Sequence, residues 1–349
     1  MKAKSMFTGL LLLATLLFFY SCTDNAAPLP PDPGKYSTGI FIVNEGPFGG
    51  SGSISWYDPA SGEVVTDVFA RENNGALLGQ FVQSLTFHNG KAYIVVNGAN
   101  KIYVVDAETF KFEKVIEGLF LPRFFLPLDE QTALVSQWGA DGLSGNVVKL
   151  DLNTNTILQT IPAGSGPDKM LRTPDGLVYV ANSGGFGVDS TISVLNVSEG
   201  VELLRILVHG KNPGSLAFFE WPSGQFLPYA HCRGSFLDAT PKGWVGPLDG
   251  TPGFETAPFG DDLVSGPDGQ SLFFSAGGSI WKVVYPAAPE KWIDQVAYGL
   301  ACDPDNGDLY CADAKDFSSA GEVVIYNAAG DRIRAFSVGV APGEIVIKR

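Results

Sequence analysis

The sequence predicts an all-β fold, a seven-bladed β-propeller of four-stranded antiparallel blades closed by pairing of its N- and C-terminal strands. Three observations predict it. One pattern recurs along the chain, in which a short β run is followed by a Gly-containing loop and an alternating strand. Gly118, Gly164 and Gly210 are 46 residues apart, and a proline follows each of them closely. Finally, the chain begins with the second strand of a copy and ends with a lone first strand. A period of about 45 residues is typical of propeller blades, whereas a two-sheet sandwich does not explain it.

The composition agrees with a folded β protein. With 349 residues, 45% of them apolar and 17% charged, the chain must bury a core. Its 42 Gly and 23 Pro disfavour the long helices of bundles and doubly wound α/β folds. The 23 basic and 37 acidic residues give a net charge of −14, which repels nucleic acids and anionic lipid headgroups. We therefore expect no nucleic-acid partner.

The N-terminus has the features of an export signal. Residues 1–21 combine two lysines with an apolar run, and the small residue Ser21 directly precedes Cys22. This order is that of a signal peptide, and the junction resembles a bacterial lipobox, in which the Cys becomes the acylated first residue. We expect residues 22–38 to form the acylated Cys and a flexible tether, and residues 39–349 to form the propeller. The protein would then be an extracytoplasmic lipoprotein. An ordinary secretory signal with an incidental Cys is the alternative.

Six copies show two consecutive strands of a blade. They are Phe41–Asn44 and Ser53–Asp58, Tyr93–Asn97 and Lys101–Asp106, Ala133–Ser136 and Val147–Asp151, Val178–Asn182 and Thr191–Asn196, Leu272–Ser275 and Ile280–Val283, and Leu309–Asp313 and Glu322–Tyr326. The fifth copy departs from this pattern. Tyr229–Cys232 is a strand, but between Phe236 and Phe259 extra Gly, Pro and aromatic residues replace a regular blade. The lone strand Glu344–Ile347 is expected to pair with Ile40–Val43, which removes an exposed sheet edge.

Loop lengths distinguish the two faces of the predicted ring. Loops that enter the innermost strands and loops that link second to third strands share one face. The long loops fall in this set: Pro47–Gly52, Arg71–Phe81, Gly139–Asn146, Gly184–Ser190, His231–Gly250 and Lys315–Gly321. On the opposite face His88–Gly90, Pro174–Gly176 and Asp305–Gly307 predict tight hairpin turns. We call these the loop-rich face and the tight-turn face, and expect the functional site on the loop-rich face.

Aromatic, amide and charged residues gather in or beside these long loops. The candidate ligand-binding residues are Phe48, Asn74, Gln83, Arg123, Trp138, Lys169, Phe186, Asn212, Phe236, Trp244 and Asp313. Aromatic planes beside polar groups suit a large ligand with an apolar body and a polar rim. The alternative for each aromatic residue is that it only packs its loop down. Asn44, Asn97 and Asn182 recur at the end of the second strand, which favours a role in the blade architecture.

The sequence offers no anchor for catalysis. Three His residues, His88, His209 and His231, lack a spacing typical of metal ligands. We expect His88 in a turn of the tight-turn face, and His209 and His231 as solvated loop residues. No nucleophile elbow, HExxH motif or phosphate loop is present. We therefore expect no metal, no cofactor and no enzymatic activity.

Two cysteines lie on neighbouring predicted strands of the last blade. If Asn306-Gly307 forms the centre of the hairpin, Cys302 and Cys311 lie opposite one another, and a cross-strand disulfide is possible in an oxidising compartment. Cys232 is then a single thiol, expected to be buried.

Three segments resemble a known family: Gly39–Gly46, Asn74–Gln80 followed by Gln83-Ser84, and the Pro122-Arg123 step. They are similar to the YncE-like, DUF5074-type propeller lipoproteins of gut Gram-negative anaerobes. The best understood members are the BtuG-type surface proteins, which capture vitamin B12 and related corrinoids above a TonB-dependent outer-membrane transporter. The resemblance implies a non-catalytic protein, lipid-anchored in the outer membrane and facing the cell exterior. Its ligand would be a cobalamin or other corrinoid, and its partner such a transporter.

Two other functions stay open at this stage. A propeller scaffold could bind protein or glycan partners at the cell surface. A metal-dependent propeller enzyme of the lactonase or lyase type is the third possibility, which a tightly bound stoichiometric divalent ion would favour.

Overall fold

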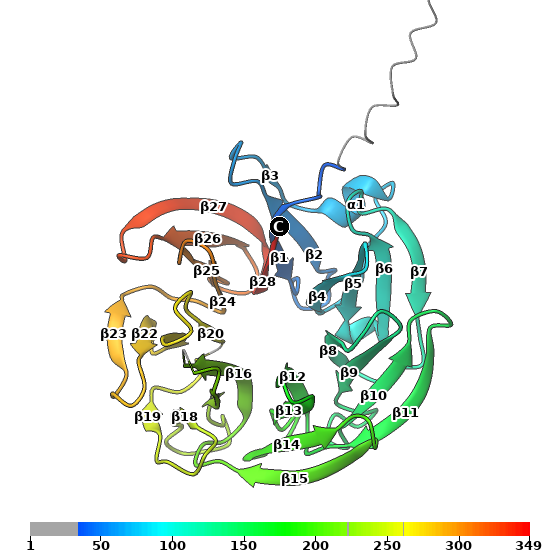
Figure 1. Ribbon diagram of the computed structural model, residues 1–349. Coiled ribbons are helices and arrows are strands. Elements are labelled where there is room, and N and C mark those ends of the chain that lie inside the picture. Colours follow the sequence, from blue (N-terminus) through cyan, green and yellow to red (C-terminus); the bar gives the residue numbers. More distant parts are fainter. Residues whose placement is uncertain (1–33, 222, 261) are drawn as a thin grey trace, which may run out of the picture. The chain divides into compact units, whose positions relative to one another are not determined.

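The computed structural model describes residues 34–221, 223–260 and 262–349, and in these residues it contains seven four-stranded antiparallel sheets. The sheets are arranged as blades around a central channel (Figure 1). This arrangement confirms the seven-bladed propeller. Within each blade the strand nearest the channel is the innermost strand, and the strands follow one another outward by antiparallel pairing.

The strand bounds follow the predicted copies closely. Blade 1 contains β28 (Pro342–Lys348), β1 (Gly39–Asn44), β2 (Ser53–Tyr57) and β3 (Val64–Val65), and blade 2 contains β4 (Val82–His88), β5 (Lys91–Val96), β6 (Lys101–Asp106) and β7 (Phe112–Ile116). Blade 3 contains β8 (Pro122–Pro127), β9 (Thr132–Gln137), β10 (Asn146–Asp151) and β11 (Thr156–Pro162), and blade 4 contains β12 (Pro167–Arg172), β13 (Leu177–Asn182), β14 (Thr191–Asn196) and β15 (Val201–Leu207).

The later blades have the same order. Blade 5 contains β16 (Pro213–Glu220), β17 (Phe226–Cys232), β18 (Gly243–Pro247) and β19 (Phe254–Thr256), and blade 6 contains β20 (Leu263–Ser265), β21 (Leu272–Ala276), β22 (Ser279–Val283) and β23 (Glu290–Ile293). Blade 7 contains β24 (Gly299–Cys302), β25 (Leu309–Asp313), β26 (Ala320–Tyr326) and β27 (Arg332–Val340). Two short helices, α1 (Val68–Glu72) and the 3₁₀ turn η1 (Asn97–Ala99), lie in connections.

The two ends of the described chain close the ring, as predicted. In blade 1 the C-terminal strand β28 pairs with β1, so that Ile347 lies opposite Ile40 and Ile345 opposite Ile42. The alternating apolar residues of both strands are thereby buried between blades 1 and 7. Since β28 pairs with β1, the edge of β1 is not left open.

The fifth blade is regular, which corrects the expectation of an insertion between Phe236 and Phe259. The residues of this stretch form the third and fourth strands, β18 and β19, and β18 pairs with β17 through Ala230 opposite Gly246. The long loop is therefore residues 233–242. The sequence did not predict β18 and β19, because their Gly and Pro residues weaken the alternation of apolar and polar side chains without preventing strand pairing.

The propeller also begins earlier than expected. Tyr36, which the sequence assigns to the tether, is buried, and its backbone N–H donates to Glu108 O at 2.9 Å. Its ring makes edge contacts with Trp56 and Phe110 at 5.2 and 5.6 Å between centroids. An aromatic residue packed between two blades is part of the core, so the described residues 34–38 belong to the folded unit. Cys22 and the signal lie outside the described residues.

The repeated glycines have a steric cause. A methyl group on Gly164 would lie 2.3 Å from Nδ2 of Asn182, and one on Gly210 would lie 2.4 Å from Cβ of Cys232. Asn182 and Cys232 both end the second strand of the next blade, and Asn182 donates to the hydroxyls of Thr191 and Ser193. The glycine therefore leaves room for a side chain that ties second and third strands together, which confirms an architectural role for the recurring Asn.

The turn between β24 and β25 contradicts the predicted disulfide. Asp303 and Asp308 close a four-residue loop, because Asp303 N–H donates to Asp308 O at 2.8 Å while the Asp303 carboxylate accepts the N–H of Asp305. This loop is centred one residue earlier than a two-residue turn at Asn306-Gly307. As a result Cys302 lies opposite Leu309, Cys311 lies opposite Leu300, and both cysteines are free thiols. Cys232 is also free, and it is buried as predicted.

Candidate functional site

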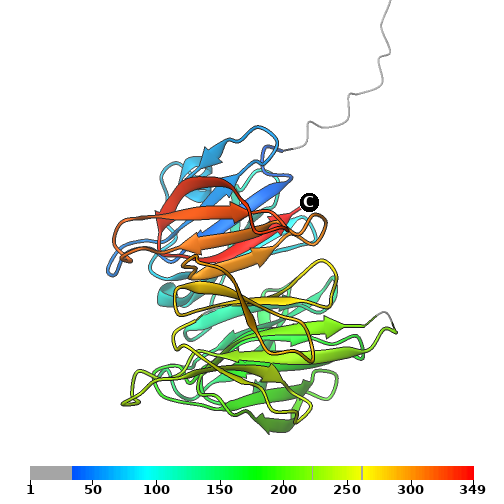
Figure 2. The same cartoon turned by 90° about the vertical axis from the view of Figure 1, so that its left-hand side faces the viewer.

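The loop-rich and tight-turn faces lie at opposite ends of the strands. Figure 2 shows the ring from its edge, with the C terminus, and hence the tight-turn face, on the right. The chain enters each innermost strand from the loop-rich face, so residues at the start of these strands lie at the mouth of the channel on that face. The sequence places Pro122-Arg123 and Pro167-Asp168-Lys169 at such starts.

Exposed aromatic rings stand on the loop-rich face. The side chains of Phe48, Phe186 and Phe236 are 94%, 71% and 81% exposed, and they come from blades 1, 4 and 5. Phe186 makes an edge contact with Trp138 at 5.6 Å, and Phe236 stacks on Phe259 at 3.9 Å. Exposed phenylalanine rings are costly in water, so these three rings in long loops of one face are candidates for ligand contacts.

Arg123 is held in place between two blades. It pairs with Asp168 at 3.2 Å and donates a hydrogen bond to the Gln83 side-chain oxygen. Its guanidinium also lies 4.3 Å from the centroid of the Trp138 ring. Asp168 is only 1% exposed, so this ion pair is largely desolvated and fixes the geometry of the cluster. The structure thus brings together Gln83, Arg123 and Trp138 of the predicted residues.

A second ion pair crosses the channel beside the first. Lys169 pairs with Asp262, whose other carboxylate oxygen accepts the Leu300 N–H at 2.9 Å. The Lys169 ammonium also lies 5.6 Å from the Phe124 ring centroid. This pair connects blades 4, 6 and 7.

Together these groups form a layer of charge at the channel mouth. The residues that line it are Glu45, Gln83, Arg123, Phe124, Asp168, Lys169, Gly214, Arg233, Asp262, Tyr298 and Gly343. The free space among them is about 40 Å³, which suits a water molecule rather than a larger ligand. A large ligand on this face would therefore contact the charged layer from above, with its apolar parts against the aromatic rings.

Trp244 does not belong to the site, which corrects its prediction as a ligand contact. It lies in β18, is 7% exposed, and packs in the core between blades 4 and 5. Its ring lies 6.1 Å from His209, and methyl groups on Gly246 and Gly253 would lie 2.3 and 2.4 Å from it. The two glycines make room for the indole within the blade.

Three other predicted residues have local roles. Asn212 adopts a positive φ of 55°, accepts the Asp189 N–H and donates to Gly234 O, so it joins two loops. Asp313 accepts the N–H of Lys315 at the end of β25. Asn74 is exposed and follows α1 closely. It lies beside the start of β7, because the side-chain oxygen of its neighbour Asn73 accepts the Phe112 N–H. Asn74 therefore lies outside the cluster around Arg123.

Asp168 and Asp262 were not among the predicted site residues, although one sequence signal pointed to Asp168. Asp168 follows Pro167 in the same way that Arg123 follows Pro122, so both residues occupy the second position of an innermost strand. Comparing these positions across copies would have identified a charged pair at the channel mouth. Asp262 directly precedes β20 and lacks the proline signal.

His231 is not a solvated loop residue, contrary to expectation. It lies in β17 and is buried, and burial, followed by the charge on Arg233, lowers the pKa of its imidazole to about 3. In the described ranges of the chain no three His, Cys, Asp or Glu residues are grouped as metal ligands. The same ranges contain no helix long and apolar enough to span a bilayer.

Comparisons with known proteins support the architecture. The family described as a domain of unknown function, DUF5074, matches residues 38–196, the stretch from β1 to β14. Together with the seven blades, this match supports a DUF5074-type propeller. No curated protein matches the chain.

Several solved structures are similar in fold. A quinonprotein alcohol dehydrogenase-like protein from Bacteroides thetaiotaomicron is 17% identical with a TM-score of 0.64, over 90% of this chain and 79% of that one. A functionally unknown protein from Desulfotomaculum acetoxidans is 14% identical with a TM-score of 0.64, over 89% and 99%. The hydrazine synthase of Kuenenia stuttgartiensis is 15% identical with a TM-score of 0.60, over 77% and 92%. At such identities the likeness concerns the fold alone.

Proposed function

We propose that this protein is a non-catalytic cell-surface binding protein that captures a cobalamin or related corrinoid on its loop-rich face. The observation that carries the proposal is the combination of exposed rings from several blades with a layer of paired charges at the channel mouth. A corrinoid is a broad, flat macrocycle with an amide fringe. Its apolar faces match the phenylalanine rings, and its amides can bond to charged and amide side chains.

The fixed position of Arg123 favours such a ligand. Its ion pair with Asp168 and its contact with Trp138 order the side chain before a ligand arrives. Binding then loses little side-chain entropy, which favours affinity. Phe186, in edge contact with the same indole, offers an apolar surface next to this polar cluster.

The proposal also includes the location of the protein in the cell and its partner. Acylation at Cys22 would anchor the chain in the outer membrane, facing the exterior, and a TonB-dependent transporter would receive the ligand. The signal-like N-terminus and the DUF5074-type architecture support this part.

Titration calorimetry of the purified protein with cyanocobalamin tests the proposal. We expect saturable binding at micromolar protein, and at least about a fivefold loss of affinity in Phe186→Ala. Leu204→Ala is the matched control, because Leu204 is an exposed apolar residue on the outermost strand β15, away from the loop-rich face. It should leave affinity unchanged. Absence of heat at micromolar protein would overturn the assignment of a corrinoid.

A protein-binding scaffold is the second candidate function. Four apolar residues of the outermost strand β15, Val201, Leu203, Leu204 and Leu207, are exposed on the side of blade 4. An apolar outer strand with unpaired backbone groups is suited to contact another protein. If Leu204→Asp abolished association with a surface partner while cyanocobalamin gave no heat, this function would replace the first.

A further inference from the structure

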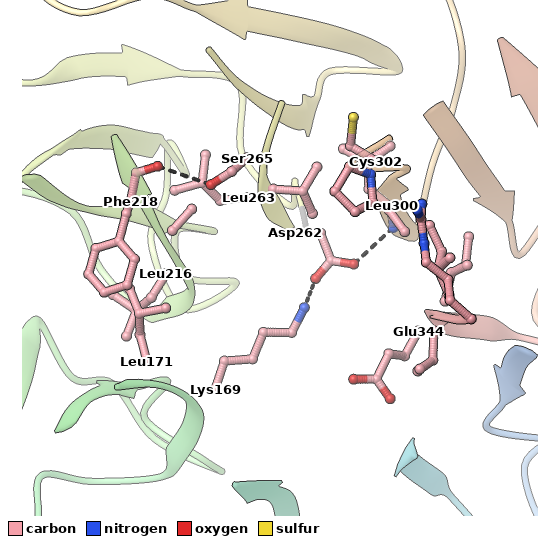
Figure 3. A pocket seen from close by; sticks show the side chains of 18 residues that line it. Lys169, Leu171, Leu216, Phe218, Asp262, Leu263, Ser265, Leu300, Cys302 and Glu344 are labelled. Carbon is pink, nitrogen blue, oxygen red and sulfur yellow. Dashed lines mark hydrogen bonds and ion pairs between the residues drawn. The ribbon is translucent and has the colours of Figure 1, made fainter. Parts of the chain in front are cut away.

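A larger cavity lies in the channel on the other side of the charged layer. Its volume is about 610 Å³, and the innermost strands β12, β16, β20, β24 and β28 line it (Figure 3). The wall is mainly apolar, with Leu171, Phe218, Val264 and Val346 among the side chains that face the space. A volume in this range is typical of pockets for small organic molecules. Nothing in the proposed function uses this cavity.

One end of the cavity is charged. The Lys169–Asp262 pair and Glu344 lie there, where the layer at the channel mouth begins. Asp262 is fully engaged, since one oxygen pairs with Lys169 and the other accepts the Leu300 N–H. The positive charge of Lys169 is therefore compensated. Glu344 adds a carboxylate to an otherwise neutral pair.

Glu344 retains an unused acceptor. Its Oε2 accepts the Leu85 N–H at 2.8 Å, whereas its Oε1 has no hydrogen-bond partner among residues 34–221, 223–260 and 262–349. Figure 3 shows the carboxylate pointing into the open space beside Lys169. Burial raises the pKa of the Glu344 carboxyl to about 7. The positive charge of Lys169 and the hydrogen bond from the Leu85 N–H lower this pKa, but by less than burial raises it. A cation bound at Oε1 would favour the ionised form.

The other end of the cavity opens toward the tight-turn face. Pro304 and Arg349 line this rim, and Arg349 pairs with Asp303 and Asp305, so its charge is also compensated. Cys302, the remaining titratable side chain of the wall, stays neutral because burial raises the pKa of its thiol to about 12. Glu344 is thus the side chain in the cavity whose charge no neighbouring cation fully balances.

We propose that the channel binds a small organic ammonium ion, whose charged nitrogen pairs with Glu344 and whose apolar body packs against the innermost strands. The ligand enters from the tight-turn face, opposite to the face proposed to capture a corrinoid, and the two sites share only the Lys169–Asp262 pair. The net charge of −14 also attracts cations to the protein as a whole.

Three isosteric probes test the chemistry: benzylammonium, benzyl alcohol and benzoate, titrated calorimetrically into the full-length protein at pH 8. We expect benzylammonium to bind at least about tenfold more tightly than the other two. At pH 5, where Glu344 holds its proton, benzylammonium affinity should fall by a similar factor. Binding at pH 7 should release protons, seen as a dependence of the heat on buffer ionisation. Equal affinity for all three probes, or no detectable binding of benzylammonium, would overturn the proposal.

Two variants assign the site. Glu344→Gln keeps the size and the Leu85 contact but removes the charge, and it should lose the preference for the ammonium. Val264→Phe leaves Glu344 intact and reduces the space, so all three probes should weaken together. Asp238→Asn is the matched control, because it removes an acidic side chain that pairs with Lys211 on the loop-rich face. If Glu344→Gln and Asp238→Asn bind benzylammonium equally well, Glu344 is not the counterion.

Discussion

The two faces of the propeller use the same strands but different kinds of chain reversal. On the tight-turn face Asn89 and Gly90 adopt positive φ angles of 48° and 70°, and the Asp129 carboxylate accepts the N–H groups of Gln131 and Thr132. Side chains there are used to fold the chain. On the loop-rich face the Asp141 carboxylate likewise accepts the N–H groups of Leu143 and Ser144, but the long loops there also carry the exposed rings of Phe48, Phe186 and Phe236. Side chains that fold the chain therefore occur on both faces, whereas these exposed rings belong to the loop-rich face.

This contrast has a sharp test in blade 5, where Trp244 and Phe236 are eight residues apart but differ in burial. Trp244→Ala should destabilise the protein by about 3–5 kcal/mol, because it empties a well-packed site between blades 4 and 5. Phe236→Ala should change stability by less than about 0.5 kcal/mol, since the ring is exposed. Urea unfolding midpoints measure both. Similar losses in the two variants would show that the loop-rich face is structural as well.

Glu344 lies between the faces, and its titration should couple stability to pH. Its folded pKa of about 7 exceeds the ordinary value of 4.5, so between these pH values the folded protein keeps a proton that the unfolded chain has released. Stability should therefore fall as pH rises through this window. In Glu344→Gln this fall is absent. As pH rises from 4.5 to 7, the free energy of unfolding of the variant should therefore increase relative to that of the natural protein by up to about 3 kcal/mol. Parallel pH profiles of unfolding free energy would contradict this.

The sequence predicted the fold better than the site, and particular residues show why. The number of blades and the closure by β28 followed from a period that each blade must repeat, and Gly164 and Gly210 preserve it because a side chain would clash. Trp244 was misassigned because an aromatic residue near a long loop has the same sequence signature whether it is buried or exposed. The cross-strand pairing of Cys302 failed because the Asp303 side chain selects a longer turn.

Among site residues, Arg123 and Lys169 were predicted because the sequence places them on the loop-rich face. Asp262 and Glu344 were not, because only the closed ring brings blades 1, 4 and 6 together. Such contacts have no local sequence pattern.

Replacing one of the repeated glycines between blades should have an intermediate effect on stability. Gly164→Ala should cost about 2 kcal/mol, because the new methyl group would displace Asn182 from its bonds to Thr191 and Ser193. Gly118→Ala is the matched comparison: it has open space around it but a positive φ of 82°, so it should cost about 1 kcal/mol from backbone strain alone. Thermal and urea unfolding distinguish the two. A smaller loss for Gly164→Ala than for Gly118→Ala would refute the steric explanation.

The smallest effect is expected in a single hairpin of the tight-turn face. Asn89→Ala should destabilise by about 1 kcal/mol, because Ala tolerates the left-handed conformation at φ 48° less well than Asn, whereas Asn89→Gly should be nearly neutral. Cyanocobalamin affinity should be unchanged in both, because the hairpin lies at the opposite end of the strands from the loop-rich face. The pair of variants thus separates stability from binding: a loss of affinity in Asn89→Ala would mean that the faces are coupled through the blade, and that turn geometry on one side sets the positions of the rings on the other.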